Sequence, residues 1–279
     1  MFRLSYNANG LRTVPLDVAI RAVADAGYQG IELSLHPRHI DPFGFRPKDA
    51  DRVRRLLDEN GIVACCLATG ADTLLSAERF EPSLVTGDEA GRDVRLTLIR
   101  RSIDFARWLG VPVINFASGI RNPEVSEVDA QRWLLDGLKR CVEYADGDVI
   151  LALEPEPGFF VQTNGEACAL IAEIGSPQFG LAQDLGHCRV VEEDYLGSVA
   201  ASLDATRIIQ VEDIKGRHHY HEIPGDGDID FRSFFDICAT GGYDGFYSVE
   251  LYNHADDFRT ALKRSIEHLR AQQHVPTAS

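Results

Sequence analysis

Acidic side chains end several apolar runs of this sequence, and their type suits a divalent cation. Glu154 closes the run VILALE, Asp184 closes FGLAQD, and Glu250 lies next to the end of FYSVEL. Pro155 has no N–H for a sheet ladder, so a strand that ends in Glu154 stops pairing there. Isolated buried carboxylates are unfavourable, whereas a hard cation such as Mg²⁺ or Mn²⁺ neutralises several of them together. The pattern therefore predicts one divalent-cation site, and a nearby imidazole would extend the choice to Zn²⁺ or Co²⁺.

Eight apolar runs, spread along the whole chain, must bring these side chains together. The runs are rich in β-branched residues and occur at 2–6, 30–35, 62–67, 112–117, 149–154, 179–184, 207–212 and 246–251. Segments with apolar residues three and four positions apart lie between them, including 16–26, 92–109, 130–144 and 258–269. Eight alternating strand and helix units in about 250 residues favour a closed barrel over an open sheet. The sequence thus predicts an α/β fold, a single-domain (β/α)₈ TIM barrel over residues 1–272, with a disordered tail at 273–279.

In such a barrel the carboxyl ends of the strands form one mouth, where active sites are built. Other polar residues at or just beyond the ends of the runs are Glu32, His36, His39, Asn115, Glu156, Gln210 and Glu212. Any one acid alone is as readily a helix N-cap or a salt-bridge partner, whereas acids at the ends of four consecutive runs favour a shared site. Glu32 and Glu156 are each as consistent with a local structural role as with a substrate contact. His36 is a further candidate for substrate contact.

Composition narrows the class of protein. The chain has 279 residues, of which 44% are hydrophobic, and no stretch of about 18 apolar residues that would span a membrane. The N-terminal segment lacks the pattern of a secretory signal. Six cysteines without metal-finger spacing are expected to be buried, reduced thiols of a cytoplasmic protein. A net charge of −15 and the lack of a basic stripe argue against a nucleic-acid partner.

At these residues the chain resembles the xylose-isomerase-like TIM-barrel family of the sugar phosphate isomerase/epimerase superfamily. That group includes ketose 3-epimerases, hydroxypyruvate isomerase and inosose dehydratase. The resemblance covers nearly the whole chain and is carried by LALEP (151–155), DLGH (184–187), GDGDIDF (225–231) and GYDGFYSVEL (242–251). It implies that Glu154, Asp184 and Glu250 bind one divalent cation, Mn²⁺, Mg²⁺, Co²⁺ or Zn²⁺. It also implies that His187 contacts the substrate.

The seventh run departs from the family pattern. Where the family has a histidine ligand, this chain has Gln210, whose side-chain carbonyl oxygen can still coordinate a cation. Glu212 is two residues further on, hence on the same face of the strand, and is the alternative ligand. The departure leaves both the fourth ligand and the identity of the metal open.

The loop after the seventh run, 215–225, carries further candidates for substrate contact. A basic residue in this loop contacts the substrate in the family, and Arg217 is the corresponding residue here. His219 and His221 alternate, so they can face one side together and bind substrate or a second metal. Solvated loop histidines are the alternative. Asp230 is expected to cap the helix that follows.

The sequence therefore predicts a metal-dependent sugar or polyol isomerase or epimerase. Glu154 and Glu250 would be its catalytic residues, which exchange a carbon-bound proton in an enediolate-type mechanism. The same pocket would support elimination, so a lyase or dehydratase, including one that cleaves carbon glycosides, is an alternative, as is a non-catalytic accessory barrel. An apurinic-site endonuclease is disfavoured by the acidic charge and the few histidines at strand ends. The expected partner is a small sugar or polyol, and a homo-oligomer stays open.

Overall fold

The structure is a computed structural model that describes residues 2–70 and 73–273. Within these residues eight parallel strands close into a barrel in chain order, and the first strand pairs with the last. The strands are β1 (Arg3–Asn7), β2 (Gly30–Ser34), β3 (Val63–Ala68), β4 (Val113–Ala117), β5 (Ile150–Glu154), β6 (Phe179–Asp184), β7 (Thr206–Val211) and β8 (Phe246–Val249). Both ends of every strand lie within two residues of the predicted run, so the predicted single-domain TIM barrel is confirmed. The predicted disordered tail lies outside the described residues, apart from Gln273.

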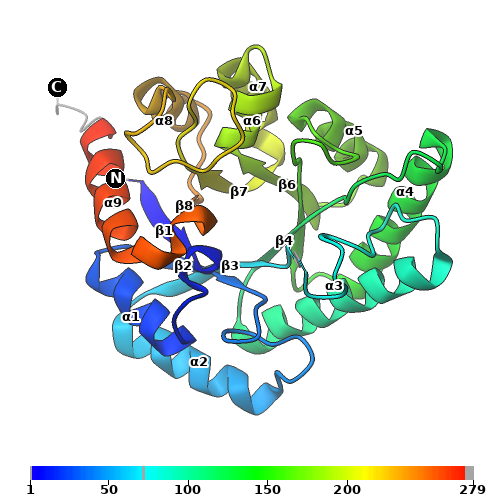
Figure 1. Cartoon of the computed structure of the whole chain (residues 1–279), viewed down its shortest axis with the longest axis horizontal. Coiled ribbons are helices and arrows are strands. Elements are labelled where there is room, and N and C mark those ends of the chain that lie inside the picture. The colour runs from blue at the N-terminus through cyan, green and yellow to red at the C-terminus, as the bar shows by residue number, and fades with distance from the viewer. Residues whose placement is uncertain (1, 71–72, 274–279) are drawn as a thin grey trace.

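Helices surround the barrel and return the chain to the start of each next strand (Figure 1). They are α1 (Leu16–Asp25), α2 (Pro47–Asn60), α3 (Glu89–Leu109), α4 (Glu127–Ala145), α5 (Asn164–Ile174), α6 (Leu185–Val191), α7 (Tyr195–Ser202), α8 (Phe231–Thr240) and α9 (Phe258–Gln272). Short 3₁₀ helices are η1 (Ala8–Leu11), η2 (Leu203–Ala205) and η3 (Tyr252–Asp257). The chain runs once round the barrel, so the blue N-terminal elements of Figure 1 lie beside the red C-terminal ones.

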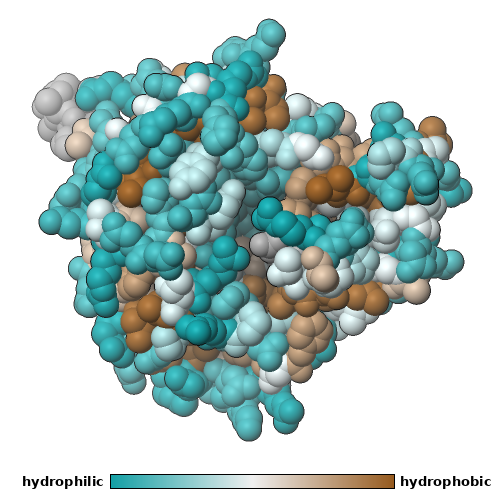
Figure 2. Space-filling view, viewed as in Figure 1, coloured by the Kyte–Doolittle hydropathy of each residue, from teal (hydrophilic) through white to brown (hydrophobic). Residues whose placement is uncertain are grey.

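The exposed surface and the burial of the cysteines agree with what the composition predicted. Hydrophilic residues cover most of the face seen in Figure 2, which is hollowed near its centre. No helix in the described part of the chain combines the length and the apolarity that a membrane span requires. All six cysteines are free thiols and five of them are buried.

A small apolar cluster fills the inside of the barrel, separate from the layer between strands and helices. Its buried members are Cys65, Cys66, Val113, Ala152, Ala182 and Ile208. Successive side chains of a strand alternate between its two faces, so the residue two positions further along points to the same side. On β4, β5, β6 and β7 that residue is polar, and these residues are Asn115, Glu154, Asp184 and Gln210. The apolar cluster thus forms a dry floor below a polar mouth.

One buried carboxylate organises the loop between β7 and α8. The oxygens of Asp213 accept hydrogen bonds from the backbone N–H groups of Ile214, Gly225 and Ile229, at 2.9, 2.8 and 3.0 Å. The backbone of Asp213 also pairs with Glu222 in an antiparallel bridge. These bonds join positions far apart along the loop, so they fix the histidine-rich segment between them.

The Asp213 contacts lead to a stability prediction. Asp213→Ala should lower the free energy of unfolding by about 3 kcal/mol, because three backbone donors lose a charged acceptor. Urea denaturation would measure the loss. Asp230→Ala is the matched control, since Asp230 caps α8 as predicted by accepting from the Ser233 N–H but lies at the surface. A surface cap contributes about 1 kcal/mol. An equal loss in the two variants would contradict the organising role of Asp213.

Candidate active site

Three carboxylates converge at the mouth of the barrel. Glu154 ends β5, Asp184 ends β6, and Glu250 directly follows β8. One oxygen of each carboxylate lies within 4.8 Å of the corresponding oxygens of the other two. The dry floor beneath them and the burial of Asp184 and Glu250, which are 1% and 8% exposed, leave little water to stabilise their charges.

Two of these carboxylates have one oxygen held by the protein and one without a partner. Asp184 Oδ1 accepts the backbone N–H of His187 at 2.6 Å and thereby caps α6. Glu250 Oε1 accepts from the side-chain amides of Asn7, at 3.3 Å, and Asn9. Asp184 Oδ2 and Glu250 Oε2 are buried and have no hydrogen-bond partner. Such oxygens are costly when left alone, so this arrangement favours a bound cation.

The third carboxylate belongs to an amide network. The Asn115 side-chain amide donates to Glu32 Oε1 at 2.9 Å and to Glu154 Oε2 at 3.3 Å. The Gln210 amide lies 3.5 Å from Glu32 Oε1 and 3.4 Å from Glu154 Oε2. Burial raises the pKa of Glu32 to about 7. Gln210 Oε1 is buried without a partner, so β7 offers a carbonyl oxygen next to Glu154.

Glu212 lies on the Asp184 side of the site. Its side chain is fully buried, and neither of its oxygens meets the geometry of a hydrogen bond. The carboxylate packs against Gly186, where an added Cβ would lie 1.6 Å from Glu212 Oε1. Burial and the neighbouring charge of Asp184 raise the pKa of Glu212. Glu212 therefore lies against the first turn of α6, whereas Gln210 contacts the carboxylate of β5.

Burial and neighbouring charges shift the pKa values of the three acids in different directions. Burial raises the pKa of Glu154 and of Glu250 well above the ordinary value, and the charges of neighbouring acids raise both further. Burial would also raise the pKa of Asp184, but the charge of His187 and the hydrogen bond from the His187 backbone N–H lower it. Without a cation, Glu154 and Glu250 therefore keep their protons to a higher pH than Asp184 does.

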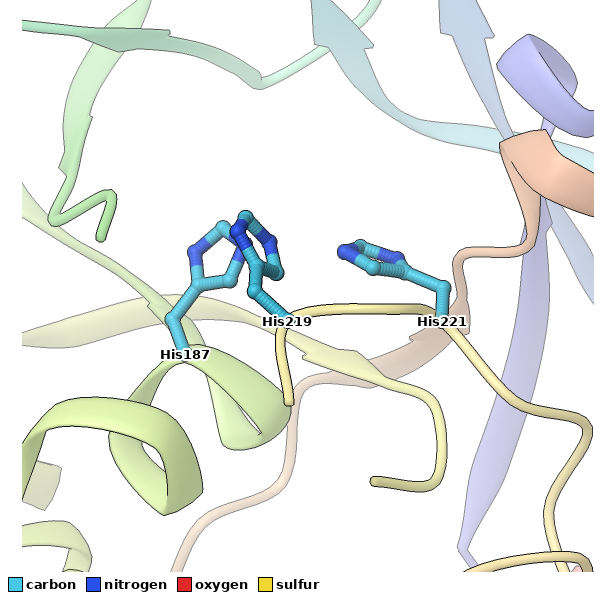
Figure 3. Close-up of side chains that lie close together, drawn as sticks. All are labelled: His187, His219 and His221. Atoms are coloured by element: carbon cyan, nitrogen blue, oxygen red, sulfur yellow. The ribbon is translucent and has the colours of Figure 1, made fainter. Parts of the chain in front are cut away.

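The predicted histidines of α6 and the β7–α8 loop lie beside the carboxylates. His187 Nδ1 is 3.7 Å from Glu154 Oε1 and 3.8 Å from Asp184 Oδ1. One ring nitrogen from each of His187, His219 and His221 lies within 4.8 Å of those of the other two. Figure 3 shows the three rings gathered from the helix and the loop.

Two other candidates lie apart from this group. Arg217 is exposed, and its guanidinium donates to the carbonyl oxygens of Val190 and Glu192 at 2.9 Å each, at the C-terminal end of α6. The His36 ring is half-buried and lies 5.6 Å from the His39 ring. Substrate contact by Arg217 or His36 stays a prediction.

The sequence analysis missed the asparagines that hold Glu250. Asn7 ends β1 and Asn9 lies in η1, so the rule that strand ends form the mouth would have found them if applied to the first run. It also overlooked Arg79, in the irregular stretch between β3 and α3. The positive charge of Arg79 is among the influences that lower the pKa of Glu156, against the stronger effect of burial, which raises it.

Comparison with known proteins places this barrel in a family. The model described as xylose isomerase-like TIM barrel matches residues 20–272. The chain belongs to this family. Within it, L-ribulose-5-phosphate 3-epimerase from Shigella flexneri serotype 5b is 26% identical over 226 residues, which cover 80% of this chain and 79% of that protein.

Solved structures of this xylose isomerase-like fold superpose closely. The 3-keto-D-glucoside 4-epimerase from Escherichia coli has a TM-score of 0.81 at 18% identity and covers 97% of this chain and 100% of its own. The IolI protein with a bound zinc atom has a TM-score of 0.77 at 16% identity, and the match covers 97% of this chain and 96% of that protein. At these identities the two likenesses bear on the fold alone.

The raised pKa values lead to a pH prediction. Between about pH 7 and pH 8, in the presence of a chelator, the melting temperature should fall as the pH rises. Because burial raises the pKa values of Glu154 and Glu250, the folded state holds their protons to a higher pH than the unfolded chain does. Raising the pH therefore favours the state that binds fewer protons. His219 and His221 oppose this trend, because burial lowers their pKa values in the folded state from 6.5 to about 4 and about 3. The unfolded chain therefore holds their protons at a pH where the folded state does not. Their effect is small above pH 7, where the unfolded histidines are also mostly neutral.

Differential scanning calorimetry across this pH range would measure the slope. Glu250→Gln removes one titrating group, so its slope should be shallower than that of the unmodified protein. Thiol ionisation is common to both proteins and cancels in the comparison. Equal slopes, or a melting temperature that rises with pH, would show that these carboxyls are ionised in the folded protein.

Proposed function

We propose that this protein is a divalent-cation-dependent sugar or polyol epimerase or isomerase. The observation that carries the proposal is the pair Glu154 and Glu250, two buried carboxyls with raised pKa values that approach one centre from different strands. Perturbed acids in a shared cleft are typical of proton-transfer sites. The names of two similar proteins, an L-ribulose-5-phosphate 3-epimerase and a 3-keto-D-glucoside 4-epimerase, support the sugar class.

The donor set fits a divalent cation. Asp184 Oδ2, Gln210 Oε1 and Glu250 Oε2 are buried atoms without hydrogen-bond partners, and all are oxygens. With Glu154 they would hold Mn²⁺, Mg²⁺, Co²⁺ or Zn²⁺. A cation held there acts as a Lewis acid that polarises a substrate carbonyl and stabilises the developing negative charge. The zinc atom of the structurally similar IolI protein supports a cation in this fold.

Glu154 and Glu250 would move the proton. A general base works best when its pKa lies near the working pH, and burial moves both carboxyls in that direction. Because they come from β5 and from the end of β8, one can remove the carbon-bound proton and the other can return a proton from another side. Asn7 and Asn115 hold one oxygen of Glu250 and of Glu154, respectively, which fixes both carboxyls in position.

We propose that six residues around this pair contact the substrate. They are Glu156, His187, His219, His221, His36 and Arg217. We also retain the predictions of a cytoplasmic protein with a small-molecule partner and without nucleic acid.

The fourth ligand gives a direct test of the cation site. Gln210→Ala should weaken Mn²⁺ binding about tenfold or more, because the site loses a neutral oxygen donor. Gln210→His should keep the site but shift its preference toward Zn²⁺, since imidazole favours that ion over hard cations. Isothermal titration calorimetry of chelator-treated protein would measure both. Glu212→Gln is the matched control on the same strand face, and weakened binding in that variant alone would identify Glu212 as the ligand.

The proton-transfer roles give a second test. Glu250→Gln keeps a coordinating oxygen but cannot accept a proton, so Mn²⁺ should stay bound while turnover falls by roughly 10²–10⁴. Glu154→Gln should behave likewise if both faces of the substrate are used. Solvent deuterium entering a panel of ketoses with added Mn²⁺ would be followed by NMR.

The pattern of exchange separates the outcomes. If only one variant is slow in exchanging the substrate proton, that residue is the base and the other is the donor. Full activity in both variants would overturn the assignment of proton transfer to these residues. Loss of water from the substrate without return of deuterium would identify a dehydratase.

A further inference from the structure

Glu32 is a fully buried acid of the barrel interior that has no part in the proton transfer proposed above. It lies on β2, and all five residues of that strand are buried. In the part of the chain that the structure describes, no group of three acidic, histidine or cysteine side chains close enough to hold one cation includes Glu32. Burial of an acid is unfavourable, so the contacts of Glu32 indicate why the barrel keeps it.

Two side-chain amides join Glu32 to Glu154. The Asn115 nitrogen lies 2.9 Å from Glu32 Oε1 and 3.3 Å from Glu154 Oε2. The Gln210 nitrogen lies 3.5 Å from the same oxygen of Glu32 and 3.4 Å from the same oxygen of Glu154. Each amide nitrogen thus lies between two carboxyl oxygens, one from β2 and one from β5.

The two carboxyl groups decide which end of the Gln210 amide faces them. The nitrogen end of an amide donates and the oxygen end accepts, so the two ends are not equivalent beside an acceptor. If the Gln210 amide were turned over, its carbonyl oxygen would face two oxygens that already accept from Asn115, and it would be repelled. In the structure Gln210 Oε1 is buried and has no hydrogen-bond partner, so it is the atom available to a cation.

Strands rather than loops fix the position of Glu32. Its neighbours in the barrel include Cys66, its partner residue on β3, and Ser248 of β8. Burial raises the pKa of Glu32, whereas the adjacent side chains of Ser248 and Cys66 lower it. Groups on strands are held more precisely than groups on loops, so Glu32 is a rigid support for another side chain.

We propose that Glu32 is a positioning residue, which holds the nitrogen end of the Gln210 amide and thereby directs Gln210 Oε1 toward the cation. This inference rests on the cation-dependent function proposed above and adds a residue that acts through Gln210 without being a ligand. Orientation matters only where a side chain has two different ends. Removal of Glu32 should therefore weaken cation binding when residue 210 is glutamine and have no further effect when it is alanine.

A double-mutant cycle on Mn²⁺ binding tests this dependence. Isothermal titration calorimetry of chelator-treated, full-length protein would compare the unmodified chain with Glu32→Leu, Gln210→Ala and the double variant. Glu32→Leu should bind Mn²⁺ about tenfold more weakly, a usual cost of losing a residue that orients a ligand. The double variant should bind no more weakly than Gln210→Ala, because the amide that Glu32 orients is already absent.

Glu32→Gln separates orientation from charge. Glutamine keeps an acceptor oxygen for the Gln210 nitrogen. Its own nitrogen would replace Glu32 Oε2 near Ser248 Oγ, and both of these oxygens are buried without partners. The Mn²⁺ affinity of Glu32→Gln should therefore stay close to that of the unmodified protein. A loss as large as that in Glu32→Leu would show that Glu32 contributes charge, and it would overturn the positioning role.

Hydrogen exchange of the side-chain amide gives a readout that needs neither the cation nor the leucine variant. In metal-free, unmodified protein, NMR should show that the Gln210 amide protons exchange about tenfold or more slower than those of Gln131, which is exposed on α4. The slow exchange should persist in Glu32→Gln. Equal exchange rates at the two glutamines, or independent losses of Mn²⁺ affinity in the double variant, would overturn the inference alone. If the unmodified protein binds no Mn²⁺, the proposed function fails with it, so the two failures are distinguishable.

Discussion

Repulsion among buried acids is the constraint on which the mouth of this barrel depends. The acids Glu32, Asp184, Glu212 and Glu250 are each at most 8% exposed, and Glu154 and Glu156 lie beside them. Each isolated buried charge is unfavourable by several kcal/mol. The protein limits this cost by raising the pKa values of most of these groups, by donating side-chain amides, and by placing imidazoles next to Asp184 and Glu156. None of these measures gives every oxygen a hydrogen-bond partner, which supports the cation proposed for the site.

Asp213 shows how a structural acid differs from those in the mouth. It is 1% exposed, as buried as Asp184, yet its oxygens accept three backbone N–H groups. Such an acid needs no ligand, because the chain itself supplies its donors. Asp184 also accepts one backbone N–H, but its second oxygen has no partner. Complete pairing identifies Asp213 as the support of the loop, and incomplete pairing supports the proposed role of Asp184 in the site.

The parts of the site that follow from strand periodicity could be predicted from the sequence. Alternation along β5 and β6 carries Glu154 and Asp184 to the mouth as soon as the barrel closes, and Pro155 indicates where β5 ends. The loop could not be predicted in the same way. The hydrogen bonds of Asp213 reach Gly225 and Ile229, 12 and 16 positions along the chain, and no local pattern encodes such contacts.

The orientation of side chains in loops could not be predicted from the sequence either. The resemblance implies that Arg217 contacts the substrate, and this stays a prediction. The sequence does not indicate that the Arg217 guanidinium donates to the carbonyl oxygens at the C-terminal end of α6, where the helix leaves acceptors unpaired. The grouping of His219 with His187 likewise joins a loop to a helix. The two-residue spacing of His219 and His221 indicated that they share a side, but not which residues they would face.

Gln210 and the histidine group together give the mouth two kinds of donor. With glutamine on β7, the carboxylate site offers oxygen donors, a set that suits hard cations such as Mg²⁺ and Mn²⁺. His187, His219 and His221 offer ring nitrogens instead, beside these oxygens. Glutamine and neutral histidine carry the same charge, so placing the amide on β7 leaves the net charge of the carboxylate site unchanged and alters only the hardness of its donors. A cation held by such oxygens would reduce the repulsion that Glu154, Asp184 and Glu250 experience, and it would do so without a histidine on β7.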